Sequence, residues 1–138
     1  MKPAVVRDRP CTGTNFLVSF GAGNARAASA GFSEVVFPTF TLEPERNATA
    51  PAQSLLLKRG VSGGLDLYTW WNEARCGMAP KRRTVKVELL AEDQRTVVLT
   101  WRFRNARPLS LAYSPLNALE GGIVIETLEL AFERMEMA

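Results

Sequence analysis

Two neighbouring segments, 84–90 and 96–104, alternate apolar and polar residues, and this pattern constrains the fold more than any other feature of the chain. Because successive side chains of a β-strand point to opposite faces, the alternation gathers the apolar residues of each segment on one face. These residues are Val85, Val87, Leu89, Val97, Leu99, Trp101 and Phe103. Only the short turn Glu92-Asp93-Gln94 separates the segments, so the sequence predicts an antiparallel hairpin with one buried face.

Further strands are predicted on both sides of this hairpin. Residues 15–20 and 123–133 alternate in a similar way, and residues 32–41 are rich in aromatic and β-branched side chains. A short strand is expected at 55–58. Pro108 and Pro115 indicate that the segment between them is not a long central strand, because proline donates no backbone hydrogen bond to a ladder.

Residues 62–77 have the helical pattern that the rest of the chain lacks. Their apolar residues fall at i, i+3, i+4 and i+7 and so share one face; they are Leu67, Trp70, Trp71 and Ala74. Ser62 is the predicted N-cap, and Gly77 fits the left-handed position after a helix end. We expect a helix over 64–76. On an isolated helix, the adjacent tryptophans would suit stacking of bases or sugars, but such a stripe more often faces a core.

About six strands and one helix indicate a mainly β fold: a small antiparallel β-barrel or sandwich with one flanking α-helix. A chain of 138 residues, 46% of them hydrophobic, fits a single domain. We place this domain at 15–138, after a flexible N-terminal arm over 1–14 that prolines interrupt. The predicted core consists of Phe16, Val18, Trp71, Val85, Val87, Trp101, Phe103, Leu128 and Leu130.

The composition argues against catalysis. The chain has no histidine, so the commonest general base and metal ligand are missing, and we expect no catalytic, metal or cofactor site. Cys11 and Cys76 lie in dissimilar contexts and are interpreted as free thiols of a reducing cytoplasm. Carboxylates at 126, 129 and 133 are most simply a solvated or subunit-facing surface. No apolar run approaches transmembrane length. The sequence therefore favours a role other than that of an enzyme.

A basic nucleic-acid-binding barrel is the alternative from another class. The net charge of +3 is a mild bias, and five basic residues are available for phosphates: Lys81, Arg82, Arg83, Arg102 and Arg104. Against this alternative, Trp101 and Phe103 alternate onto the face opposite Arg102 and Arg104, so a stacking groove would have to use the core face.

Motifs spread over nearly the whole chain resemble, in their order, the T4-like tail tube protein family of contractile-tailed phages and contractile injection systems. The most specific are a Lys-Arg-Gly motif before the helix, a Trp-x-Phe-x-Asn-Ala strand and a closing Ile-Glu-Thr-Leu-Glu-Leu strand. In this sequence they are Lys58-Arg59-Gly60, Trp101 to Ala106, and Ile125 to Leu130, supported by Asn15 to Val18, Ala30 to Val35, Trp71 to Arg75 and Asn117-Ala118.

This resemblance implies a structural protein with a β-barrel and one flanking helix. It implies hexameric rings that stack into a hollow tube inside a contractile sheath, with baseplate or tube-end proteins as further partners. Nucleic acid or effector cargo would occur in the lumen only, with no cofactor and no membrane anchor. The resemblance also implies assembly in the bacterial cytoplasm and then residence in a phage tail or injection particle. The outer helical residues Asp66, Glu73 and Arg75 become candidates for the sheath-facing surface.

One region departs from the family pattern. Family members usually carry a longer insertion between the second strand and the Lys-Arg-Gly motif, resembling a hairpin that reaches the adjacent ring. Here the region spans only 41–54 and holds two prolines. Glu45, Arg46 and Asn47 are its candidates for a ring-to-ring contact. The short region leaves two alternatives open, a specialised ring at the start or end of a tube and a tube whose rings stack through other contacts.

Overall fold

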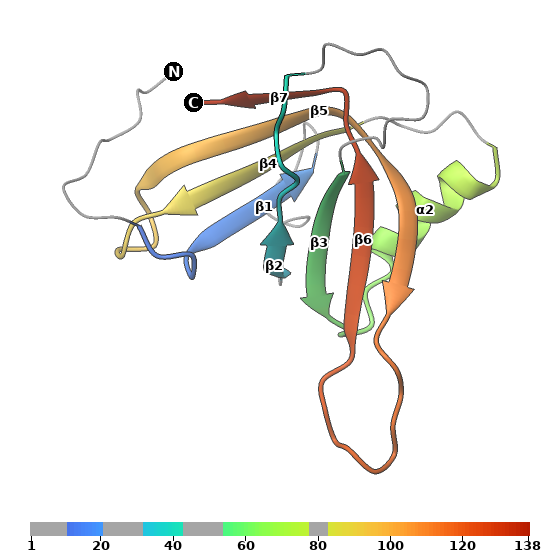
Figure 1. The fold of residues 1–138 in the computed structure, drawn as a ribbon. Coiled ribbons are helices and arrows are strands. Elements are labelled where there is room, and N and C mark those ends of the chain that lie inside the picture. The colour runs from blue at the N-terminus through green and yellow to red at the C-terminus, as the bar shows by residue number, and fades with distance from the viewer. Residues whose placement is uncertain (1–10, 21–31, 43–53, 78–82) are drawn as a thin grey trace. The chain divides into compact units, whose positions relative to one another are not determined.

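The computed structural model describes residues 11–20, 32–42, 54–77 and 83–138, which form two compact units. The first unit contains β1 (Phe16–Phe20), β4 (Arg83–Leu90), β5 (Val97–Tyr113) as far as Ala106, and β7 (Arg134–Met137). The second contains most of β2 (Phe32–Val36), β3 (Ser54–Gly60), α2 (Asp66–Arg75), the remainder of β5, and β6 (Ile125–Ala131) (Figure 1). The described part of the chain is thus mainly antiparallel β-structure with a single helix, as predicted.

The strands of the first unit follow the order β1-β4-β5-β7, and all of their pairings are antiparallel. The predicted hairpin is confirmed, since β4 and β5 pair with Val87 opposite Trp101 and Val85 opposite Phe103. Its turn is held by Asp93, whose carboxylate accepts hydrogen bonds from the backbone N–H groups of Arg95 and Thr96, both at 2.9 Å. The alternation of apolar and polar residues therefore predicted that β4 and β5 pair and that Val85, Val87 and Phe103 lie on the buried face.

One residue of β5 has an unusual backbone conformation. Asn105 has a φ of 55°, in the left-handed region that asparagine tolerates better than most residues. Its side-chain amide donates to the Glu133 carboxylate at 2.9 Å, and the Glu133 N–H donates to the Arg104 carbonyl at 3.0 Å. These bonds connect the start of β7 to β5. The sequence had indicated one final strand over 123–133, whereas the structure ends β6 at Ala131 and begins the separate strand β7 at Arg134.

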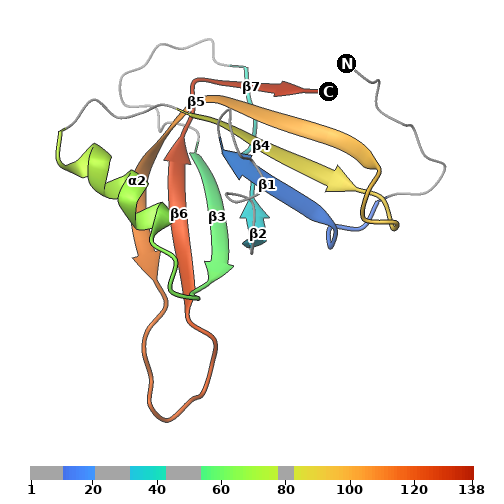
Figure 2. The same cartoon turned by 180° about the vertical axis from the view of Figure 1, so that it is seen from behind.

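The second unit has the strand order β5-β6-β3-β2, and α2 lies against one face of this sheet (Figure 2). Leu55 pairs with Leu130 and Leu57 with Leu128, and all four side chains are fully buried. Among the described strands of this unit, β6 is the one that pairs with β5, and their register shifts between Pro108 and Ser110. The segment between Pro108 and Pro115 was predicted not to be a long central strand; it is a strand as far as Tyr113, and it lies at the edge of this sheet. At the edge of a sheet a proline is tolerated, because the backbone N–H that it lacks would have no neighbouring strand to donate to.

The helix is shorter than predicted and begins differently. It starts at Asp66, and the residue before it, Leu65, makes no side-chain capping bond, so the prediction of Ser62 as the N-cap was wrong. Its end is as expected, with Gly77 at a φ of 76°. Leu67 and Trp70 are its buried residues.

The predicted core residues differ in burial. Phe103, Leu128, Leu130, Val18, Val85 and Val87 are buried, whereas Phe16, Trp101 and Trp71 are half-buried. Of the adjacent tryptophans, Trp70 lies at the centre of the buried face with 1% exposure. Successive helical residues point about 100° apart, so only one of the two can occupy that centre.

Candidate assembly surface around helix α2

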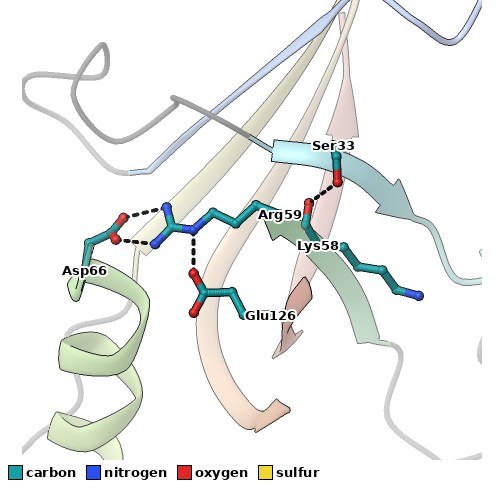
Figure 3. A network of polar contacts seen from close by, with 5 residues as sticks. All are labelled: Ser33, Lys58, Arg59, Asp66 and Glu126. Carbon is teal, nitrogen blue, oxygen red and sulfur yellow. Dashed lines mark hydrogen bonds and ion pairs between the residues drawn. The ribbon is translucent and has the colours of Figure 1, made fainter. Parts of the chain in front are cut away.

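A buried arginine connects the sheet of the second unit to the start of α2. Arg59 ends the buried row of β3, and its Nε donates to Oε1 of Glu126 on β6 at 2.7 Å (Figure 3). Its two terminal nitrogens donate to the two carboxylate oxygens of Asp66, and the bond from Nη1 to Oδ2 is 3.2 Å long. The Arg59 and Glu126 side chains are only 10% and 5% exposed, whereas the Asp66 side chain is 48% exposed. One guanidinium therefore joins two strands and a helix start.

The charges of this network stabilise one another. Burial by itself would lower the pKa of Arg59 and raise the pKa of Asp66, because burial disfavours charged forms. Hydrogen bonds and opposite charge outweigh burial, so the pKa of Arg59 is raised and the pKa of Asp66 is lowered from their ordinary values. Both groups stay charged at neutral pH. Asp66 also lies in the first turn of α2, where a negative charge suits the helix dipole. The network thus anchors a helix start that lacks a side-chain cap.

The opposite side of α2 carries aromatic rings and a guanidinium. Tyr68 is 39% exposed, and its ring centroid lies 6.3 Å from that of the half-buried Trp71. The Arg75 guanidinium lies 4.6 Å from the Trp71 ring centroid, in the geometry of a cation–π contact, and donates to the Asn72 side-chain oxygen. We call Tyr68, Trp71, Asn72 and Arg75 the outer stripe. Its four members are spaced i, i+3, i+4 and i+7.

The three predicted sheath-facing residues have different environments. Arg75 is exposed and belongs to the outer stripe. Asp66 is held by Arg59, so its carboxylate is not an independent surface charge. Glu73 is half-buried, and its Oε1 is enclosed without a hydrogen-bond partner. The structure therefore brings Arg75 together with aromatic residues and not with Asp66 or Glu73.

The acidic residues near the C-terminus also differ from the prediction. Glu126 was expected on a solvated or subunit-facing surface but is 4% exposed and paired with Arg59, so that prediction was wrong. Glu129 accepts a hydrogen bond from Ser110 at 3.0 Å, and Glu133 accepts one from Asn105. Sequence analysis missed the partnership of Arg59 with Glu126. The available signal was that Arg59 continues the alternation of Leu55 and Leu57, which places it on the buried face.

The basic residues considered for phosphate binding are partly engaged within the protein. Lys81 and Arg82 lie outside the described residues, as do Glu45, Arg46 and Asn47. Arg83 and Arg102 are half-buried, and Arg104 forms an ion pair with Glu136 at 3.0 Å. Trp101 is half-buried and Phe103 fully buried, which leaves little ring surface for stacking.

Residues 11–20, 32–42, 54–77 and 83–138 contain no group of three or more histidine, cysteine, aspartate or glutamate residues that could hold a metal ion. Within the same ranges no helix has the length and apolar character needed to cross a membrane. Neither of the chain's two cysteines, which both lie in these ranges, is part of a disulfide.

A family model matches almost the whole chain. The model described as T4-like virus tail tube protein gp19 aligns with residues 12–136. No curated protein sequence matches the chain.

Several solved structures have a similar fold. One is a chain of the sheath-tube complex of the PVC extracellular contractile injection system, with 20% identity, 95% and 93% of the two chains covered, and a TM-score of 0.76. A chain of the sheath/tube terminator of the same system has 19% identity, 96% and 99% coverage, and a TM-score of 0.79. Hcp1 from Flavobacterium johnsoniae has 11% identity, 89% and 94% coverage, and a TM-score of 0.60. These likenesses establish the fold.

Proposed function

The chain belongs to the T4-like virus tail tube protein family, and on this premise we propose that it is a structural subunit whose hexameric rings stack into the tube of a contractile particle. As a tail tube protein it is a component of a phage tail or a contractile injection system. The match over residues 12–136 is the observation that carries the proposal. The role is structural and not catalytic.

The edges of the sheets support ring formation. Among the described strands, β1 and β7 end the sheet of the first unit, and β2 and β5 end the sheet of the second. A strand at an edge has backbone groups that a neighbouring chain can pair with. A head-to-tail contact that closes into a ring pairs each edge with the next subunit and leaves none free. Ring closure thus removes a feature that would otherwise promote uncontrolled aggregation.

The surroundings of α2 support a second contact. The outer stripe combines two aromatic rings with a guanidinium, and aromatic and arginine residues are enriched where proteins bind one another. We assign this side of α2 to the surrounding sheath protein, with Arg75 as its charged contact. Baseplate and tube-end proteins are the expected partners at the ends of the tube. Assembly takes place in the bacterial cytoplasm, and nucleic acid or effector cargo passes through the lumen.

Native mass spectrometry and negative-stain electron microscopy test the ring. We expect the purified full-length chain to form particles of six subunits that stack at high concentration. Rings that never extend would favour the specialised ring at a tube start or end. A chain that stays monomeric at every accessible concentration would contradict the proposal.

Binding of single-stranded nucleic acid tests the alternative function. We expect weak binding that is lost steeply as salt rises, because only exposed phosphate contacts are available. Tight binding that persists at high salt would favour the nucleic-acid-binding barrel over the tube.

A further inference from the structure

Two groups of exposed apolar side chains lie at opposite ends of the sheet of the second unit. The first, which we call the loop cluster, lies in the β5–β6 loop and consists of Leu116, Leu119 and Ile123, which are 84%, 95% and 79% exposed. The second, which we call the β2-end cluster, follows β2 and consists of Phe37, Phe40 and Leu42, which are 36%, 40% and 93% exposed. Exposed apolar groups of this kind commonly mark contacts with other proteins.

The strand register places the clusters at the two ends. The loop that holds the first cluster leads into Ile125, which pairs with Gly60 at the end of β3. Phe40 packs against Phe132, with ring centroids 6.4 Å apart, and Phe132 follows the opposite end of β6, where Ala131 pairs with Ser54. Figure 1 shows the loop beyond one end of β3 and β6 and the chain after β2 running toward the other.

The loop has a defined structure that holds its apolar side chains outward. At its base the Ser114 N–H donates to the Ile125 carbonyl, and the Ile125 N–H donates to the Ser114 hydroxyl, both at 2.9 Å. At its tip the Leu119 N–H donates to the Asn117 side-chain oxygen at 2.9 Å. Because these bonds order the loop without burying any of its three large apolar residues, the fold itself gives no reason for their exposure.

An exposed acidic residue and an exposed basic residue lie at the two ends. Glu120 is exposed and is the single charged residue of the loop over 114–124. Arg107 is exposed at the other end, where it pairs with Ala131 in the ladder. Two surfaces that are both apolar and have opposite charges are complementary, so each end of this sheet suits the other end of a second copy.

We propose that the loop cluster of one copy seats against the β2-end cluster of a second copy stacked end to end with it, with Glu120 facing Arg107. The contact joins two different surfaces at opposite ends of the sheet, so copies stacked end to end in the same orientation repeat it along one axis. In this arrangement the β5–β6 loop makes the ring-to-ring contact. Rings could then stack although the 41–54 region is too short for the hairpin that family members usually carry. This inference rests on the proposed stacking of rings.

Reciprocal charge reversal tests the contact. We would prepare full-length Leu119→Ser, Glu120→Arg, Arg107→Glu and the double variant Glu120→Arg/Arg107→Glu. Leu65→Ser is the matched control, because it removes a leucine that is 68% exposed from the start of α2. Native mass spectrometry counts the subunits in a ring, and sedimentation gives the concentration at which rings stack. Thermal melting checks that each variant is folded.

We expect all variants to form rings and melt like the wild type. The three single variants of the contact should need at least about tenfold higher concentration to stack, while the double variant and Leu65→Ser stack at the wild-type concentration. Single variants that stack like the wild type, or a double variant that stacks no better than the singles, would overturn the contact while leaving the ring intact. A wild type without rings contradicts the proposed function itself, and the inference falls with it.

Discussion

At the scale of single residues, Arg59 has the largest predicted effect on stability. Removing one partner of a buried ion pair leaves the other charge buried without compensation. Arg59→Ala should therefore lower the free energy of unfolding by about 3–5 kcal/mol, because the Glu126 side chain, only 5% exposed, would lose its charged partner. Chemical denaturation of the variant measures this loss.

The double variant Arg59→Met/Glu126→Leu is the control. It replaces both charges with apolar side chains of similar size, and such replacements of buried pairs are often close to neutral. Recovery of most of the lost stability would show that the unpaired charge, and not the missing side-chain volume, causes the defect. A single variant as stable as the wild type would contradict our account of the network.

Asp93 is a second residue with a predicted effect, on how stability depends on pH in the acid range. Hydrogen bonds from the Thr96 backbone and hydroxyl and from the Arg95 N–H lower the pKa of its carboxyl from 3.8 to about 2. A carboxyl whose pKa is lower in the folded state contributes stability above its unfolded pKa, and this contribution is lost as the pH falls toward the folded value. The wild type should thus lose stability between pH 3.8 and about 2 through this group.

Denaturation curves of the wild type and Asp93→Asn over this pH range isolate the effect. The asparagine can still accept the turn hydrogen bonds but does not titrate, so the difference between the two proteins should be largest above pH 3.8 and shrink toward pH 2. Glu34→Gln, which changes an exposed carboxylate on β2, is the control. Parallel curves for Asp93→Asn and the wild type would show that the turn does not depend on this charge.

At the scale of elements, α2 has an inner side that builds the core and an outer stripe available to partners. Trp70 and Trp71 test this division, because they differ in burial and in nothing else of their chemistry. Trp70→Ala should cost about 3–5 kcal/mol, as expected for a large side chain removed from a core, and should misfold or melt far below the wild type. Trp71→Ala should cost clearly less, since the ring is half-buried and contacts Tyr68 and Arg75 of the outer stripe. Equal losses for the two variants in thermal melts would refute the division.

At the scale of the whole molecule, a change in the outer stripe should affect assembly with the sheath while leaving the stability of the fold nearly unchanged. Arg75→Glu reverses an exposed charge near the C-terminal end of α2 and should cost about 1 kcal/mol or less. If this side of the helix contacts the sheath, the variant should form rings yet fail to recruit sheath protein in particle reconstitution. Arg95→Glu, an exposed charge in the β4–β5 turn, is the control and should assemble normally. Sheath recruitment by Arg75→Glu at the wild-type level would remove the helix from the contact.

Local pattern in the sequence determined the strands, the β4–β5 hairpin and the presence of the helix. Alternation at 84–90 and 96–104 fixes which side chains share a face, and Val85, Val87 and Phe103 of that face are buried, whereas Val97 at its end is exposed. The order of the motifs along the chain likewise indicated the family. The strands, the hairpin and the helix follow from residues close together in sequence, so neighbouring residues suffice to predict them.

Only the tertiary structure decided the partners of the buried and exposed groups. The burial of Arg59 follows from the alternation along β3, but its partner Glu126, 67 positions away, is set by the pairing of β3 with β6, which no local pattern records. Pro108 lies in a strand because β5 is at an edge there, which depends on the order of the whole sheet. Trp70 is buried and Trp71 only half-buried, a difference that depends on how α2 packs on its sheet and not on the spacing of the apolar residues. Each outcome depends on contacts between residues distant in sequence. Such contacts form only when the whole chain has folded, so a local pattern does not predict them.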